Sequence, residues 1–210
     1  MTRSAAHRVV LAATGALLLI GSAGCASGPA AREPGAAPGL TTATPGLPEG
    51  EVTAQGTVLD DGDGAQLCLG PVAESFPPQC QGLPLAAWEW DGLDGSETAA
   101  GVTWGSYAVQ GTYDGETFTI TQPPVMLALY DPMVPDDPTG GEPGPADEAT
   151  LLRVQEEVHA DLGAAALSSW PQNGRLWVQV VWDDGILQDA ADGAYGDDVV
   201  VIQSALREVS

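Results

Sequence analysis

Apolar and polar residues alternate in several short runs between residues 51 and 130, which predicts short β-strands. This pattern covers residues 52–59, 65–69, 85–90, 102–113 and 117–121. Two turn sequences separate neighbouring runs, Asp60-Asp61-Gly62-Asp63-Gly64 and Tyr113-Asp114-Gly115-Glu116, and both are typical of β-hairpins. Five short strands with such turns favour a small β-barrel or a curved antiparallel sheet, of which an OB-like barrel is one version.

The second half changes to mixed helix and strand patterns. Apolar residues recur at helical spacing over 148–162, with Asp147 as the expected N-cap and Gly163 as the expected stop. Residues 175–182 predict a strand, 186–195 a short helix and 198–206 a further strand. The last three form a candidate right-handed βαβ crossover. The chain is therefore expected to be α+β, with a β-rich half over 51–130, an acidic Pro/Gly loop over 131–147 and an αβαβ half over 148–210.

The N-terminal residues follow a different pattern, that of an export signal. Arg3 and Arg8 precede an apolar run over 9–20, which is shorter than the roughly 20 residues that a membrane-spanning helix needs. Small residues then lead to Cys25. We expect residues 1–24 to be a signal peptide. Residues 25–50 are rich in Pro, Gly and Ala and poor in large apolar side chains, which predicts a flexible tether.

The segment Ser22-Ala23-Gly24-Cys25 resembles the lipobox of bacterial lipoproteins, although Ser22 stands where that family usually has Leu. The resemblance implies cleavage before Cys25, acyl chains such as palmitate on that residue, and attachment to the outer side of the cell membrane. The alternative is an ordinary secretory peptide with an incidental cysteine.

The net charge of the chain limits which classes of binding partner are expected. The chain has 29 acidic residues and six arginines, without lysine, for a formal charge of −23. Loss of residues 1–24 removes Arg3 and Arg8 and no acid, which leaves four arginines against 29 acids, or −25. Such a chain repels phosphate backbones, so nucleic acid is not expected as a partner. The apolar fraction of 44% is enough for a folded core.

Cys68 and Cys80 are the only cysteines besides Cys25, and an exported pair is expected to form a disulfide. A redox role is the alternative, but the spacing is unlike Cys-x-x-Cys. The stretch from Leu67 to Cys80, followed by Trp88 and Trp90, resembles a segment of uncharacterised secreted proteins and lipoproteins of actinobacteria. The resemblance covers about residues 51–125 and implies a shared scaffold without a known activity.

Few residues are available for catalysis. Once His7 is removed with the signal, His159 remains alone on the predicted helix among acids, and a solvated helix face is the favoured interpretation. Ser–His, Cys–His, Ser–Lys and His-based zinc sites therefore lack their usual parts. Paired carboxylates could still hydrolyse a glycoside. Possible members are Glu74, Glu89, Asp91 and Asp114.

Two further patterns have structural and functional interpretations. Asp60 to Gly64 superficially resembles a calcium loop, but the EF-hand spacing is not met and a hairpin turn is favoured. The six tryptophans could form an aromatic binding surface, although a place in the core is favoured. They are Trp88, Trp90, Trp104, Trp170, Trp177 and Trp182.

We therefore expect a lipid-anchored, extracytoplasmic acidic domain that binds a partner or serves the envelope structurally. The candidate partners are the membrane, through lipid on Cys25, and an envelope protein or a cell-wall polymer. No cofactor, metal site or catalytic residue is predicted. The alternative is a carboxylate-dependent hydrolase that acts on envelope glycans.

Overall fold

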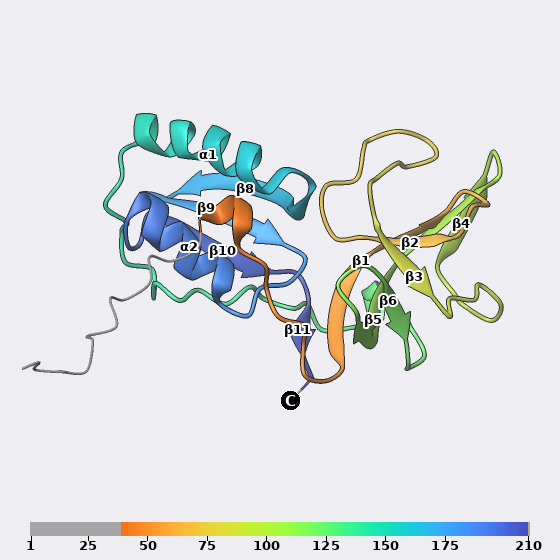
Figure 1. Ribbon diagram of the computed structural model, residues 1–210. Helices are drawn as coiled ribbons and strands as arrows, with labels where there is room; N and C mark the ends of the chain where they lie inside the picture. The colour runs from red at the N-terminus through yellow and green to blue at the C-terminus, as the bar shows by residue number, and fades with distance from the viewer. Residues whose placement is uncertain (1–38, 210) are drawn as a thin grey trace, which may run out of the picture. The chain divides into compact units, whose positions relative to one another are not determined.

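A closed β-barrel forms the first half of the protein (Figure 1). The computed structural model describes residues 39–209. The five barrel strands are β1 (Val52–Asp60), β2 (Ala65–Cys68), β3 (Leu83–Ala86), β5 (Val102–Tyr113) and β6 (Phe118–Ile120). They follow the order β1-β2-β3-β6-β5 and close by pairing of β5 with β1, and β3–β6 is the parallel pair among them. The predicted α+β fold with a small barrel is confirmed.

Three shorter strands extend this sheet. Strands β4 (Ser96–Ala99) and β7 (Val125–Met126) both pair with the long strand β5. Strand β11 (Arg207–Glu208) pairs with β1, so the end of the chain returns to the barrel. The described residues also contain three short 3₁₀ turns. They are η1 (Leu40–Thr42) before the barrel, η2 (Leu127–Leu129) after β7 and η3 (Gly163–Ala165) in the second half.

Both predicted hairpins of the barrel are present. Strands β1 and β2 pair from Asp60 opposite Ala65, and the Asp60 carboxylate accepts the Gly62 N–H at 2.9 Å. In the β5–β6 hairpin, the Asp114 carboxylate accepts the N–H groups of Glu116 and Thr117. Each Asp closes its own turn with a side-chain hydrogen bond, which is the mechanism that makes Asp frequent in turns.

The second half contains α1 (Glu148–Leu162), β8 (Ala166–Gln172), β9 (Arg175–Val180), α2 (Ile186–Tyr195) and β10 (Val200–Ser204). The Asp147 carboxylate caps α1 by accepting the Thr150 N–H at 2.8 Å, and Gly163 ends the helix at a φ of 53°. Strands β9 and β10 run parallel on either side of α2 in the sequence, as predicted. The sequence pattern did not predict β8, which pairs with β9 through a hairpin at Asn173 and Gly174, both of positive φ.

Each half has its own hydrophobic core. In the three-stranded sheet, alternate residues of β9 such as Leu176 and Val178 pack with α1, α2 and η1 on one face. The barrel core surrounds Tyr107 and Phe118. Leu206 connects the two, because its N–H donates to the Val181 carbonyl while its side chain is fully buried in the barrel core. Residues 39–209 accordingly belong to one compact unit.

The segment before β1 differs from the tether that was expected through Gly50. Leu40 is only 3% exposed and belongs to the core between α1 and α2. Farther along, the Gly46 N–H donates to Asp184 Oδ2 at 2.9 Å, and the Trp182 indole donates to the Gly46 carbonyl at 2.9 Å. The expectation of a flexible tether was wrong for residues 39–50. Composition describes a segment alone, whereas here the burial of one apolar side chain, Leu40, between two helices holds the segment in place. The rest of the expected tether lies outside the described residues.

The acidic Pro/Gly loop over 131–147 contains no helix or strand and is held at several points by side chains. Gln55 donates to the Asp131 carbonyl and accepts the Met133 N–H. Near the other end, Arg175, which is 5% exposed, donates to the Glu142 carbonyl. The loop is thus fixed on the surface where the barrel and the three-stranded sheet meet.

No helix within residues 39–209 is long and apolar enough to cross a membrane.

Candidate functional site

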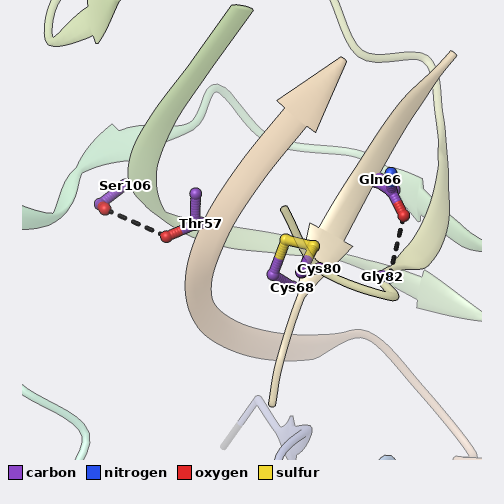
Figure 2. The surroundings of a disulfide bond; sticks show 6 residues. All are labelled: Thr57, Gln66, Cys68, Cys80, Gly82 and Ser106. Atoms are coloured by element: carbon purple, nitrogen blue, oxygen red, sulfur yellow. Dashed lines mark hydrogen bonds between the residues drawn. A yellow bond between two sulfur atoms is a disulfide. The ribbon is translucent and has the colours of Figure 1, made fainter. Parts of the chain in front are cut away.

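The disulfide between Cys68 and Cys80 is present and closes a loop on the barrel (Figure 2). Cys68 ends β2 and is 3% exposed, and the two Cα atoms are 6.0 Å apart. The Gln66 side chain accepts the Gly82 N–H at 2.8 Å, which fixes the chain just after the loop (Figure 2). The bond therefore joins a barrel strand to an irregular segment that has little secondary structure of its own.

The tip of this disulfide loop exposes an aromatic side chain. Phe76 is 77% exposed and meets Trp104 edge-to-face, with ring centroids 5.5 Å apart. Within the loop, the Ser75 hydroxyl donates to the Pro77 carbonyl at 2.8 Å. Phe76 is the one large apolar side chain of residues 69–79 that is strongly exposed, and a single exposed Phe does not define a docking surface.

The tryptophans occupy different environments. Trp88 and Trp90 pack against the barrel core and meet Tyr107 edge-to-face at 5.2 and 6.2 Å, as the core interpretation expected. Burial raises the pKa of the Tyr107 hydroxyl, which donates to the Asp94 carbonyl. In contrast, Trp170 is 37% exposed at the outer strand of the three-stranded sheet. The described structure does not gather the tryptophans into one aromatic surface.

The four carboxylates suggested for hydrolysis do not form a site. Glu74, Glu89, Asp91 and Asp114 are all exposed, and none of them lines any of the four cavities described for this protein. Asp114 serves its hairpin turn, where the N–H groups of Glu116 and Thr117 lower the pKa of its carboxyl. A general acid for glycoside hydrolysis needs a raised pKa, so the direction at Asp114 opposes that role.

His159 lies on the exposed face of α1, and its Nε2 is 2.7 Å from Ser169 Oγ. Ser169 Oγ also accepts a hydrogen bond from Gln155 at 2.8 Å. A nucleophilic serine needs a base that is itself oriented by a third group, and no described residue bonds to Nδ1 of His159. The hydrogen bond joins α1 to the edge strand β8. Without an orienting group on His159 in residues 39–209, the pair lacks the arrangement of a catalytic dyad.

The described residues contain no group of three or more His, Cys, Asp or Glu side chains that could hold a metal ion. In the stretch from Asp60 to Gly64, the Asp60 and Asp61 carboxylates bond to N–H groups of the turn, and Asp60 also accepts the Trp90 indole N–H at 3.2 Å. These carboxylates serve the hairpin.

A cavity of mixed polar and apolar lining, where the barrel and the three-stranded sheet meet, is the strongest candidate site. We call it the junction pocket, and it has a volume of about 460 Å³. Its polar walls come from β1, the acidic loop, β9 and the stretch from β10 to β11, and comprise Gln55, Asp136, Gln179, Gln203, Ser204 and Arg207. Apolar surface is added by Met133, Pro135 and Ile202. Its volume falls within the range of small-molecule sites, and its lining is more polar than is usual for them.

A second cavity of about 600 Å³ lies beside the segment before β1. Its walls include Leu47, Leu162, Val181, Trp182 and Leu187, and it has fewer polar groups than the junction pocket. Asp183 lies next to this wall, and burial raises the pKa of its carboxyl although it accepts N–H groups at the start of α2. These contacts give Asp183 a role in capping α2.

Sequence reasoning did not find the junction pocket. Its charged members, Asp136 and Arg207, are separated by most of the second half of the chain and carry no shared motif. The one indication in the sequence was the scarcity of basic residues. Because the chain has so few arginines, each arginine of the folded part is a candidate for a specific contact. The lipidation candidate Cys25 lies outside the described residues.

Comparison of the chain with protein-family models, curated proteins and solved structures found no match.

Proposed function

We propose that this protein is a lipid-anchored module on the outer side of the cell membrane that works by binding. The observation that carries the proposal is the disulfide between Cys68 and Cys80, because stable disulfides are typical of proteins outside the cytoplasm. It supports the export expected from residues 9–25. Two or more acyl chains on Cys25 would anchor the protein stably, whereas a single chain binds membranes only marginally.

The packing of Leu40 shortens the linker that this proposal requires. Between Cys25 and Gly39 lie 14 peptide steps, for which a flexible chain has a root-mean-square reach of about 20 Å. This reach exceeds the Debye length of about 8 Å at physiological ionic strength. A domain of formal charge −25 could therefore stand clear of anionic lipid headgroups.

Binding is favoured over catalysis by the exposure of the candidate carboxylates and by the absence of an orienting group on His159 among the described residues. The negative charge favours neutral or cationic partners, such as an envelope protein or an uncharged cell-wall polymer, over polyanions. It also disfavours nucleic acid.

Anchoring is tested by expressing the full chain and its Cys25→Ser variant in a bacterium that processes lipoproteins. We expect mass spectrometry of the wild type to find lipid on a new N-terminal Cys25, with residues 1–24 removed. Cys25→Ser should be released or remain unprocessed, whereas the matched control Ser27→Ala should be lipidated normally. An unmodified Cys25 in the wild type would show that the anchoring proposal is wrong.

Binding is tested by crosslinking on intact cells, in parallel with a screen of the purified protein against glycoside and ester substrates. We expect a crosslinked partner and no turnover. Turnover that is abolished by changing Glu74, Glu89, Asp91 or Asp114, with the fold intact, would establish the hydrolase instead.

A further inference from the structure

Arg207 differs from the other arginines in the described part of the chain. Arg153 pairs with Glu157 at 2.7 Å, and Arg175 pairs with Asp198 at 3.5 Å. The half-buried Arg207 lines the junction pocket, where its guanidinium makes no ion pair or hydrogen bond with another described residue. A guanidinium has five N–H donors. In a chain with 29 acidic residues, Arg207 borders this cavity and forms no ion pair with any described carboxylate.

The acidic residue Asp136 lines the same pocket and does not form an ion pair with Arg207. The position of Asp136 is fixed through its backbone, because its carbonyl accepts a hydrogen bond from Gln203 Nε2 at 2.9 Å. Gln55 holds the same loop slightly earlier in the chain, with bonds of 2.9 and 3.1 Å. The pocket is thus bordered by the half-buried Arg207 and by the solvent-exposed Asp136, on walls that glutamine side chains hold in place.

Two amide groups add neutral hydrogen-bonding capacity. Gln179 Oε1 accepts the Ser168 hydroxyl at 3.2 Å, which leaves its NH₂ group available to donate. Gln203 uses its NH₂ group on Asp136, which leaves its Oε1 available to accept. Together with the charged pair, these groups can bind a ligand that has both donors and acceptors.

The charge of the whole protein limits what this ligand can be. A net charge of −23, or −25 without residues 1–24, repels anions, so a simple anion would approach Arg207 against the field. A cation would leave Arg207 unpaired. A zwitterion has no net charge, so it avoids the repulsion and can pair with both groups. Met133, Pro135 and Ile202 offer apolar surface to an alkyl side chain.

We propose that the junction pocket binds a zwitterion of the amino-acid class, either a free amino acid or a short peptide with both ends free. Its carboxylate pairs with Arg207 and its ammonium group with Asp136. This inference rests on the proposed binding function and adds a small-molecule ligand to the macromolecular partners proposed above. The volume of about 460 Å³ leaves room for more than one residue, so ligand length is part of the test.

The test is calorimetric titration of the purified full chain with alanine, dialanine and trialanine, and with dialanine blocked as its N-acetyl or C-terminal amide derivative. We expect at least one free-ended ligand to bind, and blocking either end to weaken the binding of that ligand by about tenfold or more, since hydrogen bonds to charged groups are the strong ones. The ligand length that binds best distinguishes a free amino acid from a peptide.

Two variants test which residue binds each end of the ligand. Arg207→Gln should remove the preference for a free carboxylate over the amide and keep the preference for a free ammonium group. Asp136→Asn should do the reverse. Arg153→Gln and Glu156→Gln are matched controls, because they make the same charge changes on the exposed face of α1 and should leave affinity unchanged.

Three results would overturn the inference. The first is that the wild type binds none of the free-ended ligands at concentrations up to about 10 mM. The second is that blocked and free ligands bind equally well. The third is that both variants keep the preference for a free carboxylate and the preference for a free ammonium group. Circular dichroism and the unfolding midpoint of each variant show whether the fold is kept. Lipid on Cys25 together with a pocket that binds none of these ligands would refute this inference and leave the anchoring proposal standing.

Discussion

Replacing Leu40 by Ala tests the most consequential difference between the sequence pattern and the structure. Leu40 is 3% exposed and packs in the core between α1 and α2, whereas Leu47 in the same segment is 58% exposed. The same substitution at the two positions therefore compares a packed and an exposed leucine within eight residues. If the segment were a tether, the two variants would behave alike.

The expected magnitude follows from burial. Leu→Ala substitutions in packed cores destabilise by about 2–5 kcal/mol, from lost transfer free energy plus the cavity that remains. Because the segment can detach locally instead of unfolding the protein, Leu40→Ala should fall at the lower end, about 2–3 kcal/mol. For a protein of this size, that lowers the melting temperature by about 4–12 °C. Leu47→Ala should change stability by less than about 0.5 kcal/mol.

The assay is urea unfolding of the purified chain, followed by tryptophan fluorescence and by far-ultraviolet circular dichroism. Hydrogen exchange at the backbone amides of Thr42 and Ala43, which bond to the Gly39 carbonyl, reports on the segment directly. We expect Leu40→Ala to lower the unfolding midpoint and to speed exchange at these amides. If both leucine variants leave the midpoint and the exchange rates unchanged, the packed segment is refuted and the tether extends to Gly50.

Three further predictions concern stability. Reducing the disulfide should lower the free energy of unfolding by about 2–4 kcal/mol in urea titrations, and an unchanged midpoint after verified reduction would contradict this. Hydrogen bonds from Thr150 lower the pKa of the Asp147 carboxyl, so this cap stabilises the fold above the ordinary Asp pKa and is lost as the pH falls through the lowered value. Asp147→Ala should therefore lower the melting temperature at pH 7, and by more than Asp147→Asn does, because Asn is also a good N-cap. The deficit of Asp147→Ala relative to the wild type should shrink in acid, and equal losses in the two variants at pH 7 would argue against the cap. Phe118→Ala should lower the free energy of unfolding by about 3–5 kcal/mol because Phe118 is fully buried. Phe76→Ala, at a side chain that is 77% exposed, should lower it by less than about 1 kcal/mol in the same assay, and the reverse order would contradict the barrel core.

The features that the sequence determined are those with a local cause. The β1–β2 and β5–β6 hairpins were predictable because Asp and Gly favour tight turns and the flanking residues alternate. Helix α1 was predictable for a similar reason, since its apolar spacing and its Asp147 cap lie within one stretch. The disulfide followed from counting, because only two cysteines remain after Cys25. The lipid on Cys25 stays a prediction.

The features that only the tertiary structure decided depend on residues far apart in the chain. Closure of the barrel pairs β1 with β5, and the burial of Leu40 needs a gap between two helices that come more than 100 positions later. Strand β8 was missed because Ser, Trp and Pro give it no clear alternation, and its pairing with β9 supplies the order. Asp136 and Arg207 border one pocket although no local pattern connects them. Periodicity and turn chemistry describe neighbours along the chain, whereas the shape and charge of a cavity depend on which distant surfaces meet when hydrophobic cores form.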